Sequence, residues 1–334
     1  MSKPRTALIV GTGKFGRHYV RILSRLENAI MPKAVAFHRL ILTRTSLEPA
    51  RKTASALAKD APDGVVIIGE QVDNEDDLDR ILERYQPDFT CIVAKDPKRG
   101  NRIHAGYSVR ALAAGVDVLC EKPFSEADGT GSSLTEANQL IPYDRTGRIG
   151  LELPFAAVRT HTQRALQWES RFLEFGKIEF FWGTQTPLQT NLFNELAVHP
   201  WSLIPDNWST VRLRMEAGRT TAVAAGMLQH ETMNRTMDLQ IRLSRENRFR
   251  GFRAGSRSFG FRTAGTTVQL IELDGAIEEA SLLDPSLWTG RILLKSENPL
   301  RQNIIASLLH QPITDVRRTI NSQIFLEMGQ GYRP

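Results

Sequence analysis

The chain has 334 residues, of which 41% are hydrophobic and 24% charged, which is the composition of an ordinary globular protein. That composition excludes a disordered chain, a collagen-like repeat and a small disulfide scaffold, and the length predicts about two domains. Lysine and arginine number 43 against 37 aspartate and glutamate residues, so the formal net charge is +6. The positive charge is scattered, and no basic run indicates a nucleic-acid-binding segment.

The chain carries no hydrophobic segment of the kind that enters a membrane. No stretch reaches the roughly 18 apolar residues that a spanning helix needs, and the N-terminus lacks a signal-peptide pattern. We therefore expect a cytoplasmic protein without a membrane partner. The two cysteines, Cys91 and Cys120, lie in apolar segments, where a thiol usually packs as a small hydrophobic group. They are predicted to be buried, reduced and structural.

The N-terminal part of the chain alternates short apolar runs with helical patterns. Strands are predicted at 6–10, 34–43, 65–68, 88–94 and 116–120. Helices are predicted at 14–27, 46–59, 73–85, 102–114 and 126–140. Strands that alternate with helices of about 10–15 residues predict a parallel, doubly wound α/β sheet of the Rossmann type.

The pattern changes after about residue 155. Strands are predicted at 178–183, 210–216, 220–226, 237–243, 259–263, 268–273 and 276–280, and helices at 158–175, 191–204, 299–309 and 313–328. Because few helices separate the strands, an open, mainly antiparallel sheet is expected. We therefore predict a doubly wound domain over 1–124 and an α+β domain over 125–334, with the terminal helices free to pack back on the first domain.

A glycine-rich segment ends the first predicted strand and opens the first predicted helix. Its G-x-G-x-x-G pattern consists of Gly11, Thr12, Gly13, Lys14, Phe15 and Gly16. In this position the first glycine allows a tight turn, the second lets the backbone approach a pyrophosphate, and the third lets the helix pack closely on the strand. The amides at the helix N-terminus then bind the phosphates. We predict a dinucleotide-binding site; the alternative is an ordinary strand-to-helix turn.

The end of the second predicted strand bears on which dinucleotide is bound. Proteins that bind NAD usually carry an acidic residue there for the ribose hydroxyls, whereas an arginine suits the 2′-phosphate of NADP. This chain has Thr43, Arg44 and Thr45 and no acid. A guanidinium flanked by hydroxyls matches a phosphate, so NADP is favoured and NAD is left open. The alternative is that Arg44 is a solvated loop residue.

Three segments together resemble a known family. They are the glycine-rich segment, the sequence HAGYSVRALAAG from His104 to Gly115, and VLCEKP at 118–123, which follows the pattern aGxxVxcEKP. The combination resembles the glucose–fructose oxidoreductase/inositol dehydrogenase/MocA-type (Gfo/Idh/MocA) oxidoreductases. The resemblance implies a nicotinamide-dependent enzyme with a Rossmann domain and an α+β domain. It also implies a homo-dimer or homo-tetramer formed through the C-terminal sheet.

The resemblance implies roles for individual residues. Lys122 is expected to orient and polarise the substrate hydroxyl, and His199 to accept or donate its proton. Glu195 lies four residues before His199, on the same helix face, where the family usually has an aspartate. The residues expected on the nicotinamide side of the cofactor are Asp96, Pro97, His104, Glu121, Lys122 and Pro123. The alternative for His199 is a helix-end histidine before Pro200 without a chemical role.

Two departures from the family pattern fall near the expected substrate pocket. The family commonly has Thr-Pro-Asn after the fourth strand and a histidine four residues after the proline. Here Pro97 is followed by His104 only after seven residues, so 98–101 is a small insertion. The glycine pair that usually precedes the acid-x-x-x-His segment is also missing. The substrate is therefore predicted only as a small polar molecule, sugar- or polyol-like, with a hydroxyl, keto or imine carbon.

Other features carry less specific signals. The remaining histidines lack partners at metal-ligand spacing and no G-x-S-x-G occurs, so neither a metal nor hydrolase chemistry is expected. The segment 242–262 mixes arginine with phenylalanine, which also suits single-stranded nucleic acid; an exposed sheet face or subunit interface is the preferred interpretation. A non-catalytic NADP-binding regulator and an imine or tetrapyrrole reductase stay open as alternative functions.

Overall fold

The structure, a computed structural model, describes residues 5–13, 15–26, 37–95, 100–153, 155–166, 175–185, 191–264 and 266–333. The chain forms two compact units, each built from separate segments. The first unit comprises Met1–Glu126, Glu136–Glu152 and Ile304–Val316. The second comprises Ala127–Thr135, Leu153–Asn303 and Arg317–Pro334.

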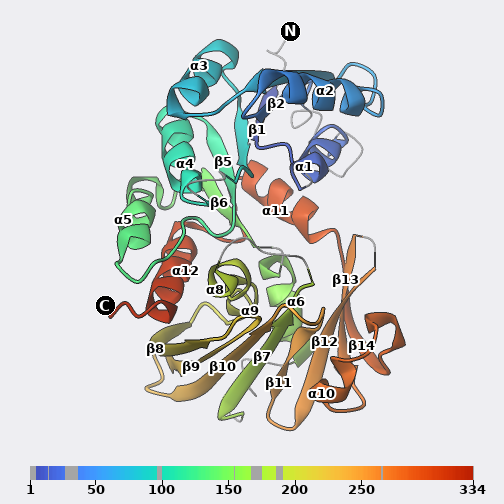
Figure 1. Cartoon of the computed structure of the whole chain (residues 1–334), viewed down its shortest axis with the longest axis vertical. Coiled ribbons are helices and arrows are strands. Elements are labelled where there is room, and N and C mark those ends of the chain that lie inside the picture. The colour runs from blue at the N-terminus through green and yellow to red at the C-terminus, as the bar shows by residue number, and fades with distance from the viewer. Residues whose placement is uncertain are drawn as a thin grey trace. The chain divides into compact units, whose positions relative to one another are not determined.

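The first unit contains a six-stranded parallel sheet in the order β3-β2-β1-β4-β5-β6. Its strands are β1 (Thr6–Val10), β2 (Arg39–Arg44), β3 (Val66–Gln71), β4 (Phe89–Ile92), β5 (Asp117–Glu121) and β6 (Ile149–Glu152). Its helices α1 (Gly16–Leu23) and α2 (Leu47–Ala58) cover one face, and α3 (Glu75–Tyr85) and α4 (Ile103–Ala113) cover the other (Figure 1). The predicted Rossmann-type sheet is confirmed.

Two elements in the first half of the chain depart from the prediction. The strand β6 lies outside the predicted strands, because four residues that include a glycine and a glutamate give little periodic signal. Its position at the sheet edge depends on pairing with β5 and on Leu151, whose N–H donates to Thr314 O at 3.0 Å. The helix predicted at 126–140 is shorter, α5 (Ser132–Asn138), because Gly129 and Gly131 adopt left-handed φ angles of 83° before it.

The second unit contains an eight-stranded sheet in the order β14-β13-β12-β11-β7-β10-β9-β8. Its strands are β7 (Lys177–Gly183), β8 (Trp208–Ala217), β9 (Thr221–His230), β10 (Thr236–Ser244), β11 (Arg250–Ala254), β12 (Arg257–Ala264), β13 (Thr267–Leu273) and β14 (Gly290–Glu297). The strands β7 and β10 pair in parallel and the other neighbours are antiparallel. The expected open, mainly antiparallel sheet is confirmed.

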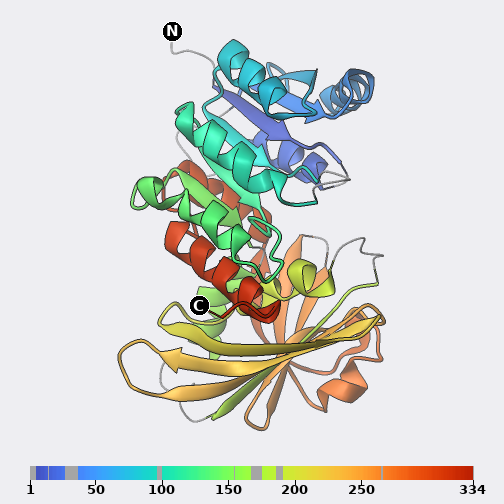
Figure 2. The ribbon, with the colours of Figure 1, turned by 60° about the vertical axis from the view of Figure 1, so that its left-hand side comes forward.

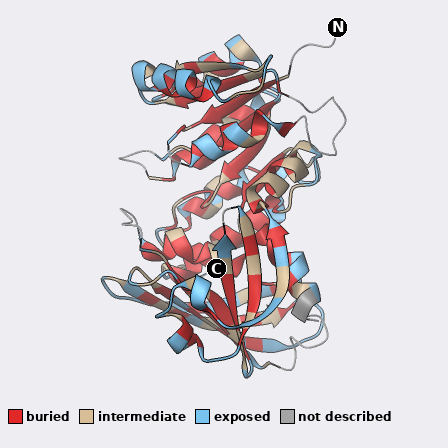
Figure 3. Cartoon of the chain, turned by 90° about the vertical axis from the view of Figure 1, so that its right-hand side faces the viewer, coloured by how far each residue is buried: buried red, intermediate tan, exposed pale blue. Residues whose placement is uncertain are grey.

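The remaining helices differ in length. They are α6 (Ala156–Leu166), α8 (Leu192–Leu196), α9 (Val198–Trp201), α10 (Ile277–Ala280), α11 (Pro299–Leu308) and α12 (Val316–Gly329), with single 3₁₀ turns at Ile141–Tyr143 and Pro285–Leu287. Three of these helices, α8, α9 and α10, have only four or five residues, whereas α6, α11 and α12 have 10 to 14. The helices α8 and α9 pack on one face of the eight-stranded sheet (Figure 2). Buried and more exposed positions therefore alternate along a strand such as β10. Figure 3 shows buried and exposed positions along the strands of the sheet.

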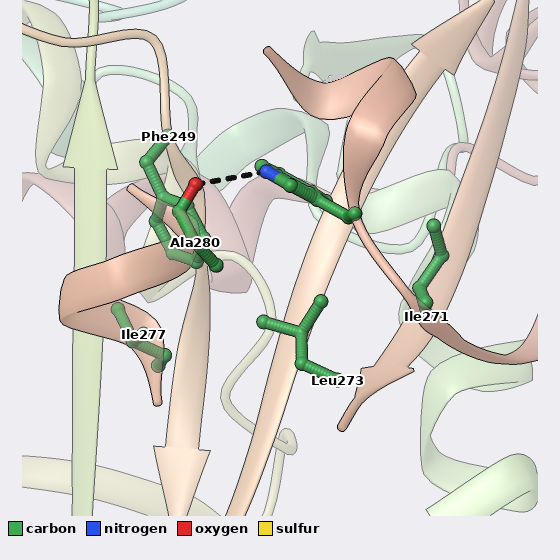
Figure 4. Packing of buried hydrophobic residues seen from close by; sticks show 6 residues of the cluster. Phe249, Ile271, Leu273, Ile277 and Ala280 are labelled. Carbon is green, nitrogen blue, oxygen red and sulfur yellow. Dashed lines mark hydrogen bonds between the residues drawn. The ribbon is translucent and has the colours of Figure 1, made fainter. Parts of the chain in front are cut away.

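The strand predicted at 276–280 is wrong: these residues form the helical turn α10. Ile277 and Ala280, three residues apart, both turn inward and join Phe249, Ile271, Leu273 and Trp288 in a small hydrophobic cluster (Figure 4). The indole N–H of Trp288 donates to Ala280 O at 2.9 Å. This tertiary contact selects a helical turn where the local sequence suits either structure.

The arginine-rich segment 242–262 spans β10, β11 and β12. Arg242 and Arg253 form ion pairs with Glu179 on β7, and Arg257 pairs with Glu272 on β13. The guanidinium groups of Arg242 and Arg253 also lie over the ring of Phe181. The arginines of this segment thus form ion pairs with carboxylates on neighbouring strands.

Cys91 and Cys120 are free thiols and both are buried, as predicted. Burial raises the pKa of each thiol, which keeps both in the neutral form. Of the helices that the structure describes, none has the length and apolar character needed to cross a membrane. Within the same residues, no group of three or more His, Cys, Asp or Glu side chains is arranged to hold a metal ion.

Candidate active site

A pocket of about 400 Å³ lies in the first unit, where β1, β2, β4 and β5 end and β3 is followed by Val72. The carboxyl edge of an open parallel sheet is the usual ligand site of such folds. Nine residues predicted to bind the dinucleotide line it: Gly11, Thr12, Gly13, Phe15, Gly16, Thr43, Arg44, Thr45 and Glu121. Lys14, Asp96 and Pro97 were predicted with them and lie outside the described residues.

The three positions of the turn require glycine for different reasons. Gly11 has a φ of 96°, and a Cβ there would lie less than 3.0 Å from the backbone of Ala94 at the end of β4. A Cβ on Gly16 would lie less than 3.0 Å from the carbonyl oxygen of Gly11. A Cβ on Gly13 would meet nothing within 4 Å. Gly11 and Gly16 are therefore required by the fold, whereas Gly13 borders open space that a phosphate can enter.

The glycine turn is fixed to the end of β2. Thr12 donates to Thr43 O from both its amide and its hydroxyl, each at 3.0 Å. The amide of Gly11 donates to Thr43 Oγ1 at 3.3 Å. Arg44 follows directly, half-buried in the pocket wall, and its Nη1 is 3.5 Å from Thr53 Oγ1. The buried Thr43 thus holds the turn and the arginine at one end of the pocket.

The charge around the pocket suits an anionic ligand. Among the described residues that line it, the cations are Arg44 and Lys95, and Glu121 is the one carboxylate. The end of β2 presents a guanidinium and hydroxyls, as a phosphate requires. The open side of Gly13, the N-terminus of α1 and this arginine together fit the phosphate groups of a dinucleotide.

Several residues that line the pocket were not predicted as binding residues. They are Val10, Val72, Val93, Ala94 and Lys95. All lie at or just after the carboxyl ends of β1, β3 and β4, so the rule that ligands bind at that edge of the sheet would have found them. The glycine pattern and the family resemblance predict binding residues at other positions.

His104 holds two of the loops at this edge together. Its Nδ1 lies 2.9 Å from Pro123 O and its Nε2 lies 2.6 Å from Ala94 O. The ring is buried, with 1% of the residue exposed. It therefore connects the end of β4 with the segment after β5, where the half-buried Lys122 precedes a cis bond to Pro123.

Glu195 and His199 lie in the second unit, on α8 and α9. Both are half-buried, whereas Leu196, Ala197 and Val198 between them are buried, so the two polar side chains share the more open side of the helical segment. The imidazole of His199 stacks on Trp182, with ring centroids 6.0 Å apart and an interplanar angle of 17°. Phe155 meets the same imidazole edge-on at 5.8 Å. These aromatic contacts restrict the orientation of the ring.

The end of α9 is held by Arg318 from α12. Its Nη2 donates to Ile204 O at 2.6 Å and to Trp201 O at 3.3 Å, and its guanidinium lies 4.1 Å from the centre of the Trp201 ring. Its Nη1 forms an ion pair with Asp206 at 3.0 Å. A cation at a helix C-terminus neutralises the exposed carbonyl groups, so Arg318 fixes the segment that carries His199.

A buried carboxyl, absent from the predicted site, lies beside Glu121. Glu152 ends β6, is 1% exposed, and its Oε1 has no hydrogen-bond partner among the described residues. Burial raises its pKa to about 8, the negative charge of Glu121 adds to the rise, and the positive charge of Lys122 opposes it. Glu152 is therefore a neutral acid over much of the range in which a solvated glutamate is ionised.

This shift predicts a pH-dependent stability. Between pH 4.5, the ordinary pKa, and about 8, the folded protein binds a proton that the unfolded chain releases, so stability falls as pH rises through that window. Glu152→Gln removes the titration. We expect the unfolding free energy of the variant, relative to the native protein, to increase by roughly 2–5 kcal/mol across the window. Urea unfolding of both proteins at the two ends of this pH window measures the change. A difference in unfolding free energy that does not vary with pH contradicts the prediction.

Comparison with known proteins agrees with this geometry. Residues 5–143 match the model of an oxidoreductase family with an NAD-binding Rossmann fold. No curated protein sequence matches the chain. The fold resembles that of a mutant 3-ketoreductase from Actinomadura kijaniata in complex with TDP-benzene and NADP (14% identity, TM-score 0.66, covering 98% of this chain and 97% of that chain).

Two further structures share the fold over nearly their whole length. One is UDP-N-acetylglucosamine 3-dehydrogenase from Acidithiobacillus ferrooxidans (17% identity, TM-score 0.63, covering 98% of this chain and 97% of that chain). The other is an inositol dehydrogenase homolog complexed with NAD+ from Azotobacter vinelandii (14% identity, TM-score 0.63, covering 100% of this chain and 96% of that chain). At these identities the likeness is one of fold.

Proposed function

Because the chain belongs to the Gfo/Idh/MocA family of oxidoreductases, we propose that it transfers a hydride between a nicotinamide dinucleotide and a hydroxyl, keto or imine carbon of a small polar substrate. The observation that carries the proposal is the glycine turn, joined to Arg44 through Thr43, around a pocket at the carboxyl edge of a parallel sheet. The sugar and inositol names of proteins that share the fold support a sugar- or polyol-like substrate.

Each group of residues has its own role in the proposed hydride transfer. The bound dinucleotide supplies or accepts the hydride. The glycine turn and the N-terminus of α1 bind its pyrophosphate. The ammonium of Lys122 polarises the substrate oxygen and stabilises negative charge that develops on it. His199 accepts the hydroxyl proton in oxidation and returns it in reduction, with Glu195 orienting the imidazole.

Two statements about the whole protein belong to the same proposal. We place it in the cytoplasm, and we propose a homo-dimer or homo-tetramer formed through the eight-stranded sheet. Light scattering coupled to gel filtration measures the oligomeric state. A monomer at micromolar concentration contradicts that part of the proposal.

NADP is the proposed cofactor, and Arg44 is the residue that selects it. Arg44→Ser removes the cation at the end of β2, so we expect the Kd of NADP to rise about 10–100-fold and that of NAD to change less than about threefold. Isothermal titration calorimetry measures both. Arg51→Ser, which removes an exposed arginine from α2, is the matched control and should leave both values unchanged. Equal losses for NADP and NAD in the Arg44 variant would contradict the selection.

The activity is tested by following nicotinamide absorbance with a panel of sugars, inositols, keto acids, imines and a linear tetrapyrrole. Turnover of a sugar or polyol is the expected result. Turnover of the imine or tetrapyrrole alone assigns the protein to a biosynthetic reductase instead. Tight NADP binding without turnover, together with a co-purifying protein, favours a non-catalytic regulator.

A further inference from the structure

Two carboxyl groups lie side by side at the carboxyl edge of the parallel sheet. Glu121 ends β5 and Glu152 ends β6, and the two residues are register partners in adjacent parallel strands. Register partners in a parallel pair place their side chains on the same face of the sheet. Glu121 lines the nucleotide pocket, whereas Glu152 is 1% exposed. Glu152 therefore lies behind the pocket wall, next to the carboxylate that forms part of it.

The surroundings of Glu152 do not stabilise a second negative charge. Its Oε1 has no hydrogen-bond partner in the described part of the chain, and neither has the buried hydroxyl of Tyr19 on α1, which interacts electrostatically with both carboxyls. Ser307 and Pro312 approach Gly150 from the segment that covers β6, and neither is ionisable. An ionised carboxylate whose Oε1 has no donor among the described residues is disfavoured in such a place, which favours the protonated form.

The buried tyrosine and cysteines around this part of the sheet stay uncharged around neutral pH. Burial raises the pKa of Tyr19 on α1, of Cys91 on β4 and of Cys120 on β5. The charged groups that act on Glu152 are Glu121 and Lys122. Of the four buried groups whose pKa is raised here, Glu152 is the one that exchanges its proton closest to neutrality.

We propose that Glu152 is a positioning residue whose protonation state sets the charge behind the Glu121–Lys122 end of the pocket. That charge determines whether the protein binds the oxidised or the reduced nucleotide more tightly. The inference rests on the proposed function. With its proton, Glu152 leaves one carboxylate, Glu121, beside the Lys122 ammonium. When the proton passes to solvent, a second negative charge appears beside Glu121. The oxidised nicotinamide ring carries a positive charge that the reduced ring lacks, so deprotonation favours the oxidised form.

The test compares the Kd of NADP+ with that of NADPH by calorimetry from about pH 6.5 to about pH 9.5. The 2′-phosphate and the adenine are common to both ligands, so their titration cancels in the ratio. In the native protein we expect the ratio of the NADPH to the NADP+ constant to rise about three- to tenfold with pH, with a midpoint near 8. In Glu152→Gln the ratio should stay constant within about twofold, which a merely structural role for Glu152 does not predict.

A second readout needs no ligand. The infrared carbonyl band of a protonated carboxylic acid should be present at about pH 6.5 and lost with the same midpoint. It should be missing in Glu152→Gln and retained in the control Glu70→Gln, which changes a carboxyl on β3 away from the pocket lining. A pH-independent ratio in the native protein, or absence of that band, overturns the inference. If neither nucleotide binds at any pH while the infrared band is still present, the proposed function is overturned and not the protonation of Glu152.

Discussion

We expect Lys122→Ala to lower kcat by about 10²–10⁴-fold on the substrate found in the panel. The ammonium stabilises charge that appears on the substrate oxygen as hydride is transferred, and alanine supplies nothing in its place. Because we assign the phosphate groups to the glycine turn and Arg44, the Kd of NADP should change less than about threefold. A loss in kcat with little change in nucleotide affinity identifies an interaction made in the transition state.

The controls separate this role from a general effect of charge. Lys52→Ala removes an exposed lysine from α2 and should leave kcat unchanged. Lys122→Arg retains the charge in a larger group and should recover part of the activity. Unchanged turnover in Lys122→Ala would remove the lysine from the mechanism, and a parallel collapse of NADP affinity would make it a binding residue.

Substitutions in the glycine turn have the second large expected effect, because replacing Gly16 should lower stability whereas replacing Gly13 should weaken nucleotide binding. A Cβ on Gly16 would lie less than 3.0 Å from the carbonyl oxygen of Gly11, and backbone on both sides leaves little freedom to adjust. We expect Gly16→Ala to lower the unfolding free energy by roughly 3 kcal/mol or more. Thermal unfolding followed by circular dichroism measures the change.

Gly13→Ala should behave in the opposite way. A Cβ there meets nothing within 4 Å, so the Tm should stay within about 2 °C of that of the native protein. The same methyl group occupies space that we assign to the pyrophosphate, so the Kd of NADP should rise at least about tenfold. Gly218→Ala in the second unit, where the Cβ would be 3.4 Å from Thr221, controls for the substitution itself. Undiminished affinity in Gly13→Ala would contradict the assignment of the turn.

Much of the first unit follows from local signals. The apolar runs of β1 and β4 are buried throughout, and α3 is preceded by the N-cap residue Asn74, whose side chain accepts from the amide of Asp77. The glycine pattern marks the turn because only glycine satisfies the close approaches at Gly11 and Gly16. Such features depend on a few consecutive residues, so they can be read from the chain alone.

Elements at sheet edges and in hairpins were harder to predict. The strands β6, β11 and β14 lie outside the predicted strands, and the strand predicted at 276–280 is the turn α10. The strand β6 depends on Leu119 and Thr314, which are distant in sequence, and α10 depends on Trp288, eight residues after Ala280. A short segment adopts whichever structure its neighbours complete, so its own periodicity does not decide.

For the candidate site, the sequence by itself determined the glycine turn, Arg44 at the end of β2, and the helical spacing of Glu195 and His199. Each is a property of neighbouring positions along one strand or one helical segment. Only the tertiary structure placed Lys95 in the pocket wall and Glu152 behind Glu121. The carboxyl ends of separate strands meet through the hydrogen-bond register of the sheet, and the charge state of a carboxyl at that edge depends on how completely the surrounding elements exclude water.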